Sequence, residues 1–188
     1  RCIQALGGAF AGPSIDIGTR LLLEHLPDHL PEHRGGTAAE GEVIDFACGT
    51  GAAAATIALR NPTVSVYATD QSSASVASAR ATAVANGVGD RVPVARDDLP
   101  GARTAASAAF IALNPPFHTG AAVTDALAPR FFADAARVLR SGGDLWVVWN
   151  SHLRYREVLE RLVGDTRQIA RNSRFTLTAS TRRPVESG

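Results

Sequence analysis

The segment Asn114-Pro115-Pro116-Phe117 has the residue types of a site that orients a planar nitrogen. It follows an apolar run, 105–113, that predicts a buried strand. The side-chain oxygen of Asn114 and the carbonyl oxygen of Pro115 can both accept hydrogen bonds from one NH2 group. The prolines remove backbone N–H donors and restrict the backbone, and Phe117 offers a flat face on which a base can stack. The segment predicts a site that presents an amino or amide nitrogen for alkylation, with an ordinary proline-rich loop as the alternative.

A glycine turn, Gly49-Thr50-Gly51, forms the second candidate site. With Ala54 it fits the dinucleotide pattern G-x-G-x-x-A, and Asp70 follows at about the 20-residue spacing expected of a ribose-binding acid. Glycines in such a turn let a cofactor approach the backbone. A nicotinamide-dependent dehydrogenase is therefore a legitimate alternative on this pattern alone.

Asp45, within the strand before the turn, separates the two interpretations. The spacing Asp45-x-Ala47-x-Gly49-x-Gly51 is close to the acidic-x-Gly-x-Gly-x-Gly loop that binds S-adenosylmethionine. A carboxylate there can help to hold a cationic amino-acid tail, whereas it would repel a pyrophosphate. Because an Asn-Pro-Pro-aromatic turn serves amino-methylation and has no role in hydride transfer, the sequence favours a methyltransferase over a dehydrogenase.

The elements that must position these residues alternate between strand and helix. Expected strands cover 42–48, 64–69, 91–96, 105–113, 144–150, 166–170 and 175–180. Expected helices cover 52–60, 72–86, 124–140 and 155–163, the third of them closed by Ser141-Gly142-Gly143. This alternation predicts an α/β fold with a mainly parallel seven-stranded sheet and helices on both faces. The last two strands have no helix between them, so we expect a C-terminal antiparallel hairpin.

Ligands of such sheets bind at the carboxyl ends of the strands. The candidate residues fall at four successive strand ends, which are marked by the glycine turn, Asp70, Asp97 and Asn114. We expect three parts: an N-terminal helix and flexible loop over 1–41 that cap the cofactor site, one globular catalytic unit over 42–183, and a tail over 184–188.

Composition limits the remaining possibilities. The 188 residues contain 45% hydrophobic and 20% charged residues, which is typical of a soluble globular domain. All 19 basic residues are arginine and the net charge is +1, so any nucleic-acid contact must be a local patch. The segment 151–183 is such a candidate, with eight arginines against three acidic residues, although solvated surface charge explains it equally well.

The numbers of cysteines and methionines predict the redox compartment of the chain and whether it is a fragment. Two cysteines, Cys2 and Cys48, have no metal-ligand spacing and predict a reducing, cytoplasmic location. No apolar run reaches transmembrane length, so we expect no membrane partner. The absence of methionine predicts a fragment or processed product, from which an N-terminal domain could be missing. We expect a monomer.

Together these motifs resemble the bacterial ribosomal RNA guanine-N2 methyltransferases, within the methyltransferase small domain group, over about residues 10–180. The matching segments are 16–23, 45–51, 70–72, 114–118, 142–145, 150–153 and 172–175. The resemblance implies a Rossmann-like class I methyltransferase fold, S-adenosylmethionine as cofactor and the N2 amine of a guanine in ribosomal RNA as methyl acceptor.

The resemblance also implies roles for individual residues. The catalytic set is Asn114, Pro115, Pro116 and Phe117, which would orient the guanine amine so that its lone pair points at the methyl group. The cofactor-binding set is Thr19, Asp45, Ala47, Cys48, Gly49, Gly51, Asp70, Gln71, Asp97 and Asn114, with Gly18 and Thr19 at the methionine end. No metal is implied, and no dedicated general base is required.

Three departures from the family pattern bear on these roles. Ala47 replaces the first glycine of the family loop, and Asp97 stands where close relatives often have asparagine. The degenerate N-terminal copy of the domain that often aids RNA binding has no counterpart in this chain.

Amino-methylation of a protein glutamine or a DNA adenine is the alternative function, although those enzymes often have tyrosine at the position of Phe117. A non-catalytic RNA-binding module is disfavoured, because such copies typically lose the loop glycines or the Asn-Pro-Pro turn.

Several other residues carry weaker signals. His25, His29 and His33 could mimic metal ligands on a helix, but nearby prolines favour solvent-exposed loop positions. Cys48 is expected to be a small packed thiol rather than a nucleophile. For His118, a contact with the RNA and a structural role are equally plausible. The remaining aromatic residues of note, Trp146 and Trp149, are expected in the core.

Overall fold

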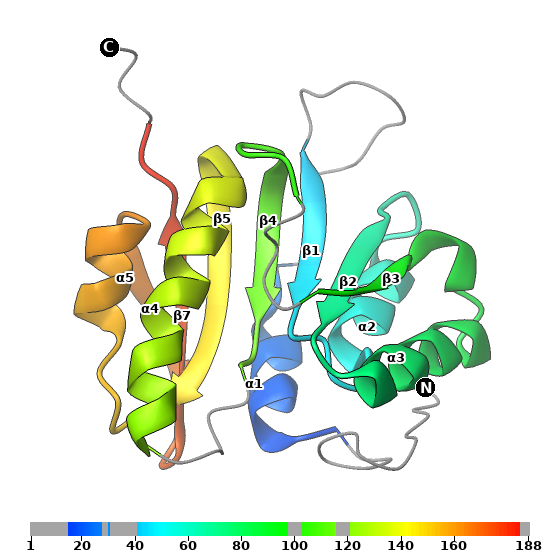
Figure 1. Cartoon of the computed structure of the whole chain (residues 1–188), viewed down its shortest axis with the longest axis horizontal. Helices are drawn as coiled ribbons and strands as arrows, with labels where there is room; N and C mark the ends of the chain where they lie inside the picture. The colour runs from blue at the N-terminus through cyan, green and yellow to red at the C-terminus, as the bar shows by residue number, and fades with distance from the viewer. Residues whose placement is uncertain (1–14, 28–29, 31–40, 98–102, 116–120, 185–188) are drawn as a thin grey trace.

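The computed structural model describes residues 15–27, 30, 41–97, 103–115 and 121–184, and these residues form one seven-stranded sheet (Figure 1). The strands are β1 Glu42–Phe46, β2 Val66–Asp70, β3 Val94–Arg96, β4 Ala108–Leu113, β5 Leu139–Asn150, β6 Thr166–Arg171 and β7 Phe175–Thr181. Their order across the sheet is β3-β2-β1-β4-β5-β7-β6. The first five strands pair in parallel, whereas β7 pairs antiparallel with both β5 and β6. The predicted mainly parallel sheet with a C-terminal antiparallel hairpin is confirmed.

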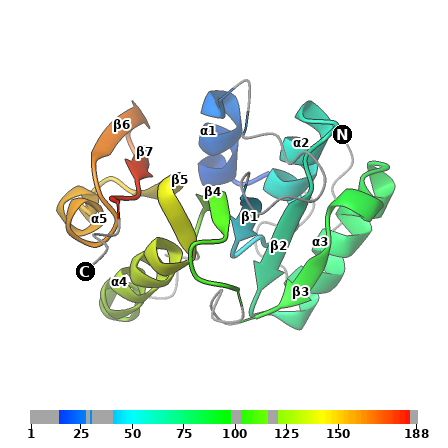
Figure 2. The same cartoon turned by 90° about the horizontal axis from the view of Figure 1, so that it is seen from above.

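Helices cover both faces of the sheet, as predicted. They are α1 Ile17–His25, α2 Ala52–Arg60, α3 Ser73–Ala85, α4 Ala121–Val138 and α5 Arg156–Leu162, with a short 3-10 helix at Gly89–Arg91. Figure 2 shows α1, α2 and α3 on one side of the sheet and α4 and α5 on the other. Within the described ranges, no helix combines the length and apolar character that crossing a membrane requires.

The alternation of side chains along the strands builds a separate core on each face. Val43 and Phe110 point into the core beneath α1–α3, whereas their chain neighbours Ile44 and Ile111 point into the core beneath α4 and α5. All six residues of β4 are buried, because the strand is covered on both faces. This explains why β4 is a continuous apolar run in the sequence. Trp146 and Trp149 are both buried, one in each core, as expected.

Helix α1 shares its core with the sheet. Leu21, Leu22 and Leu23 are buried in the same cluster as Phe110 of β4. Asp16 is the N-cap residue of α1, since its Oδ1 accepts a hydrogen bond from the backbone N–H of Thr19 at 3.1 Å. The buried leucines hold α1 against the sheet, and the N-cap fixes where the helix begins.

The region around Gly142 differs from the prediction. The sequence pattern gave Ser141-Gly142-Gly143 as a helix stop before a strand at 144, but β5 already begins at Leu139. Gly142 has φ +75°, and the pairing with β4 jumps from Leu139 to Asp144, which identifies a bulge. The N–H of Gly142 donates to the carbonyl of Arg182 at 2.9 Å, so sheet hydrogen bonding continues past the glycine. A glycine that permits a bulge thus has the same local sequence pattern as one that ends a helix.

Candidate active site at the carboxyl ends of the strands

Four neighbouring parallel strands, β3, β2, β1 and β4, end at the same edge of the sheet, which is the lower edge in Figure 1. The glycine turn follows β1, Asp70 ends β2, Asp97 follows β3 and Asn114 follows β4. The fold therefore brings the four predicted strand ends together. Thr19 joins them from α1 through a hydrogen bond described below.

The loop after β1 has left-handed backbone at alternate residues. Ala47, Gly49 and Gly51 have φ values of +55°, +54° and +74°. A Cβ atom on Gly51 would lie 2.8 Å from the Cα of Ala79 in α3, whereas one on Gly49 would meet nothing within 4 Å. Gly51 thus permits close packing of the loop on α3, and Gly49 leaves open space beside the backbone. Ala47 adopts the conformation that a glycine would adopt more readily.

Asp45 lies beneath this loop and is 3% exposed. Its Oδ2 accepts a hydrogen bond from the N–H of Ala54 at 2.8 Å, in the first turn of α2. The N-cap residue of α2 is Gly51, which has no side chain, so Asp45 satisfies one of the free N–H groups of that turn. Burial raises the pKa of Asp45 to about 7, the bond from Ala54 opposes this rise and the charge of Asp70 adds to it. A cation beside Asp45 would favour its ionised form.

Asp70 connects the ends of β1 and β2 through backbone hydrogen bonds. Its Oδ2 accepts from the N–H of Gly49 at 3.0 Å, and its Oδ1 accepts from the N–H of Ser72 at 2.8 Å. A carboxylate has about four lone-pair positions, so both oxygens can still accept from a ligand hydroxyl. The orientation of the side chain is fixed by backbone groups alone.

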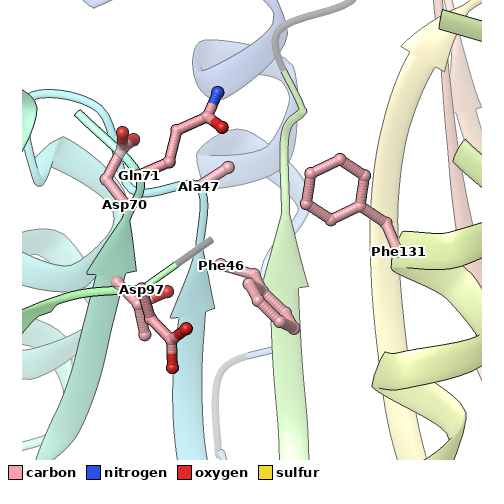
Figure 3. A pocket seen from close by; sticks show the side chains of 7 residues that line it. Phe46, Ala47, Asp70, Gln71, Asp97 and Phe131 are labelled. Atoms are coloured by element: carbon pink, nitrogen blue, oxygen red, sulfur yellow. The ribbon is translucent and has the colours of Figure 1, made fainter. Parts of the chain in front are cut away.

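A pocket opens between these strand ends and α4 (Figure 3). It is lined by Phe46, Ala47, Thr69, Asp70, Gln71, Asp97 and Phe131. Asp70 and Asp97 lie on one side of it, and Phe131 lies across from them. The rings of Phe46 and Phe131 meet edge to face, with centroids 6.3 Å apart. Apolar rings opposite two acceptor side chains suit a flat heterocycle that carries an amine and a ribose.

Thr69 supplies a further observation about this pocket. Its Oγ1 is buried and has no hydrogen-bond partner among the described residues. Buried hydroxyl groups are rarely left without a partner, so a polar group of a ligand fits here. The sequence did not single out Phe46, Thr69 or Phe131, because Phe46 and Thr69 are common residue types in strands and Phe131 belongs to an amphipathic helix.

Asn114 is held by two side chains of the α1 region. Its Nδ2 donates to Oδ1 of Asp16 at 3.1 Å and to Oγ1 of Thr19 at 2.9 Å. An ionised carboxylate can only accept, so the NH2 group of Asn114 must face Asp16 and its Oδ1 is directed elsewhere as an acceptor. A Cβ on Gly18 would lie 3.0 Å from Oδ1 of Asn114, so the small residue permits this close approach. Asp16 was not predicted as a site residue.

The other candidates fall into two groups. Pro115 is buried beside Asn114, whereas Pro116, Phe117, His118, His29 and His33 lie outside the described residues. Burial raises the pKa of the Cys48 thiol well above its usual range, and the charges of Asp45 and Asp70 add to the effect. This agrees with a packed thiol rather than a nucleophile. Within the described part of the chain, no group of three histidine, cysteine, aspartate or glutamate side chains could hold a metal ion.

Comparison with known proteins identifies related sequences. Residues 2–179 match the model of the methyltransferase small domain family. The ribosomal RNA large subunit methyltransferase G of Streptomyces avermitilis is 41% identical over 170 residues, covering 90% of this chain and 42% of that protein. The protein of the same name from Aeromonas salmonicida is 37% identical over 181 residues, covering 93% of this chain and 44% of that protein. The chain thus spans less than half the length of these relatives.

Solved structures show the same architecture. The Thermus thermophilus 16S rRNA N2 guanine methyltransferase (RsmC), in complex with AdoMet and guanosine, superposes with a TM-score of 0.78 at 29% identity, covering 97% of this chain and 50% of that one. TrmN from Thermus thermophilus superposes with a TM-score of 0.63 at 22% identity, which shows a shared fold alone. The predicted Rossmann-like class I methyltransferase fold is confirmed.

Proposed function

Because this chain belongs to the methyltransferase small domain family, we propose that it methylates the exocyclic N2 amine of a guanine in ribosomal RNA. The observation that carries the proposal is the fixed orientation of Asn114, whose amide NH2 faces Asp16 and Thr19. The acceptor oxygen of Asn114, which lies beside Gly18, thereby remains available for a substrate amine. The names of the related proteins support ribosomal RNA as the substrate and guanine N2 as the acceptor atom.

The residues at the strand ends fit S-adenosylmethionine, which supplies a methyl group already activated on a sulfonium. Asp70 would accept hydrogen bonds from the ribose hydroxyls, and Asp97 would accept from the adenine amine. Gly49 leaves room for the cofactor beside the backbone, and the carboxylate of Asp45 balances the cationic amino-acid tail. Gly18, Thr19, Ala47, Cys48, Gly51 and Gln71 complete the proposed cofactor-binding set.

Asn114 and Pro115 act on the methyl acceptor. The lone pair of a guanine amine is delocalised into the ring, so the free amine is a poor nucleophile. Hydrogen bonds from its two hydrogens to Oδ1 of Asn114 and to the carbonyl of Pro115 favour a pyramidal nitrogen and direct its lone pair. The main contribution of the protein is therefore positioning. The alkylated nitrogen is acidic and can release its proton to water, so no side chain is needed as a general base.

The target guanine must leave its stack to reach this site. Phe117, in the predicted catalytic set with Pro116, would stack on the base. The large-subunit relatives favour RNA of the 50S particle, whereas the RsmC structure concerns 16S RNA. We propose the large subunit as the substrate and a cytoplasmic monomer as the working form.

Methyl transfer from radiolabelled S-adenosylmethionine tests the proposal. The substrates are separated 30S and 50S subunits and their deproteinised RNAs, followed by nucleoside analysis, with Asn114→Ala as the inactive control. We expect label in N2-methylguanosine from the 50S subunit or its RNA. Label in methyladenosine or in protein would contradict the proposed acceptor. Cofactor binding without labelled RNA would contradict the proposed substrate for this chain.

A further inference from the structure

Two loops beside the candidate active site carry arginines that the cofactor and acceptor sites do not use. Strand β5 runs parallel to β4, so the loop after Asn150 lies at the same edge as Asn114. In the antiparallel pair, Asn150 lies opposite Phe175, and Arg171 at the end of β6 lies opposite Thr176. The β5–α5 loop and the β6–β7 turn therefore both lie at the active-site edge, at the bottom of Figure 1.

Backbone and small polar groups hold these two loops together. The N–H of Ser151 donates to the carbonyl of Arg174 at 2.9 Å, and the Ser151 and Thr176 hydroxyls are hydrogen-bonded at 2.8 Å. Oδ1 of Asn172 accepts from the N–H groups of Arg174 and Phe175, at 2.9 and 2.8 Å. These hydrogen bonds fix the path of the backbone, and the Arg174 guanidinium lies 5.9 Å from the centroid of the neighbouring Phe175 ring.

The arginines of these loops are exposed and lack acidic partners. Arg154, Arg171 and Arg174 are all exposed, and none forms an ion pair with a described residue. The segments 150–154 and 171–174 contain no aspartate or glutamate. Elsewhere arginines do find carboxylates, as Arg103 does with Glu42 and Arg137 with Asp134. These two loops are therefore locally cationic in a chain whose net charge is only +1, whereas the carboxylates of the active-site edge lie at β1–β3 and at the start of α1.

The spacing of strands places this charge near the acceptor site. β7 is the second strand from β4, and neighbouring strands lie about 4.8 Å apart, so the turn before β7 is about 10 Å from the end of β4 across the sheet. Because the target guanine must be unpaired, the flanking nucleotides present a single strand with exposed phosphates. Guanidinium groups bind phosphates through paired N–H donors.

We propose that Arg154, Arg171 and Arg174 form a phosphate-binding surface for single-stranded RNA that flanks the target guanine. The proposal rests on the proposed function and identifies where its substrate is held. The proposal also separates the arginines of segment 151–183 into two sets. Arg161, Arg167 and Arg183 lie towards the edge of the sheet opposite the active site. Arg167 lies opposite Ala179 near the start of β6, and Arg183 follows the end of β7.

Fluorescence anisotropy of a labelled single-stranded RNA of about 12 nucleotides tests the proposal across about 50 to 200 mM salt. The test variant is Arg154→Gln/Arg171→Gln/Arg174→Gln, and the matched control is Arg161→Gln/Arg167→Gln/Arg183→Gln, which removes the same charge. We expect the test variant to bind RNA at least about tenfold more weakly, with a log–log salt slope smaller by about 2. S-adenosylmethionine affinity, measured by calorimetry, should match wild type in both variants.

Three outcomes decide the proposal. Weaker RNA binding in the test variant alone supports it. Equal losses in the two variants would show a general charge effect and overturn it, as would unchanged binding in the test variant. The methyl-transfer assay tests the proposed function separately. Wild-type protein that binds RNA in the anisotropy assay but labels no guanine would show that the proposed function fails while the RNA-binding surface stands.

Discussion

The two halves of the active-site edge hold their polar side chains in different ways. In the half formed by β1 and β2, which we call the cofactor half after its proposed role, Asp45 and Asp70 accept hydrogen bonds from backbone N–H groups. In the half that begins at β4, which we call the acceptor half, Asn114 donates to side chains of α1 and its N-cap. The first arrangement depends on the path of the local backbone, whereas the second depends on two particular residues almost a hundred positions earlier.

This difference predicts how each half responds to substitution. Backbone donors remain when a neighbouring side chain changes, so the geometry around Asp70 should tolerate most substitutions that preserve the loop. Removal of a side-chain partner frees Asn114 to rotate or to flip its amide. Loop conformation should therefore control cofactor binding, and side-chain identity should control turnover.

The largest effect is expected at the residue that faces the methyl acceptor. Asn114→Ala removes the acceptor oxygen, so kcat should fall about 100- to 1,000-fold, as for other single hydrogen-bonding groups that act at the reacting atoms. The dissociation constant for S-adenosylmethionine should stay within about threefold, because the pocket residues remain. Steady-state kinetics and calorimetry measure the two quantities. Turnover equal to wild type would defeat the proposed mechanism.

Two glycines in the cofactor half form a matched pair. Gly51→Ala combines a left-handed alanine with a 2.8 Å contact to Ala79, so it should lower the free energy of unfolding by about 3 kcal/mol. Gly49→Ala has the same backbone strain without the contact and should cost about 1 kcal/mol. Its methyl group would enter the open space, so it should weaken cofactor binding more than its stability loss explains. Urea denaturation and calorimetry separate the effects, and identical stability of the two variants would refute the packing argument.

Asp16→Ser tests the acceptor half indirectly, because Asp16 acts on the methyl acceptor only by orienting Asn114. Serine retains the N-cap of α1 but is too short to maintain the contact with Asn114, so kcat should fall about tenfold while the stability of α1 persists. A positioning role predicts that the substitution has no further effect on kcat when Asn114 is already alanine. Additive losses in the double variant would instead indicate an effect on the fold.

The smallest effect is a pH dependence in the cofactor half. The carboxyl of Asp45 has a pKa of about 7 in the fold and 3.8 as a free group. The folded state therefore binds more protons than the unfolded state between these values, and stability without cofactor should decline as pH rises from about 4 to 7. A cationic ligand favours the ionised form, so cofactor affinity should rise about eightfold between pH 6 and 7.5. Calorimetry at both pH values checks this, and Asp45→Asn should abolish the rise; persistence of the rise in that variant would exclude Asp45 as its source.

The relative positions of the residues on β1 and β2 could be predicted from the sequence better than the contacts of Asn114, for the same physical reason. Asp45, Gly49, Gly51 and Asp70 lie within 26 consecutive residues, and the motif itself encodes the backbone path that connects them. The contact between Asp16 and Asn114 spans 98 residues and depends on how α1 packs, while Asp16 alone has the pattern of an ordinary N-cap. The alternation of strands and helices gave the topology.

Other features could not be predicted from the sequence, because they depend on contacts between segments that are far apart in the chain. Phe131 belongs to an amphipathic helix, and only its packing against Phe46 shows that it borders a pocket rather than filling a core. Gly142 has the composition of a helix stop, but its partner Arg182 continues the sheet. The assignment of arginines to the two ends of the sheet likewise requires the strand register.

The packing of α1 on the sheet links the proposed turnover to the fraction of molecules in which α1 is docked. Asn114 has its oriented amide only in molecules whose α1 is docked on the sheet, while the contacts of Asp45 and Asp70 do not involve α1. Local opening of a single short helix such as α1 has a smaller free energy than global unfolding. A molecule with α1 undocked would keep those contacts yet lack a prepared acceptor site, so under the proposed function the observed kcat should scale with the docked fraction. Hydrogen exchange of the α1 amides would report that fraction directly.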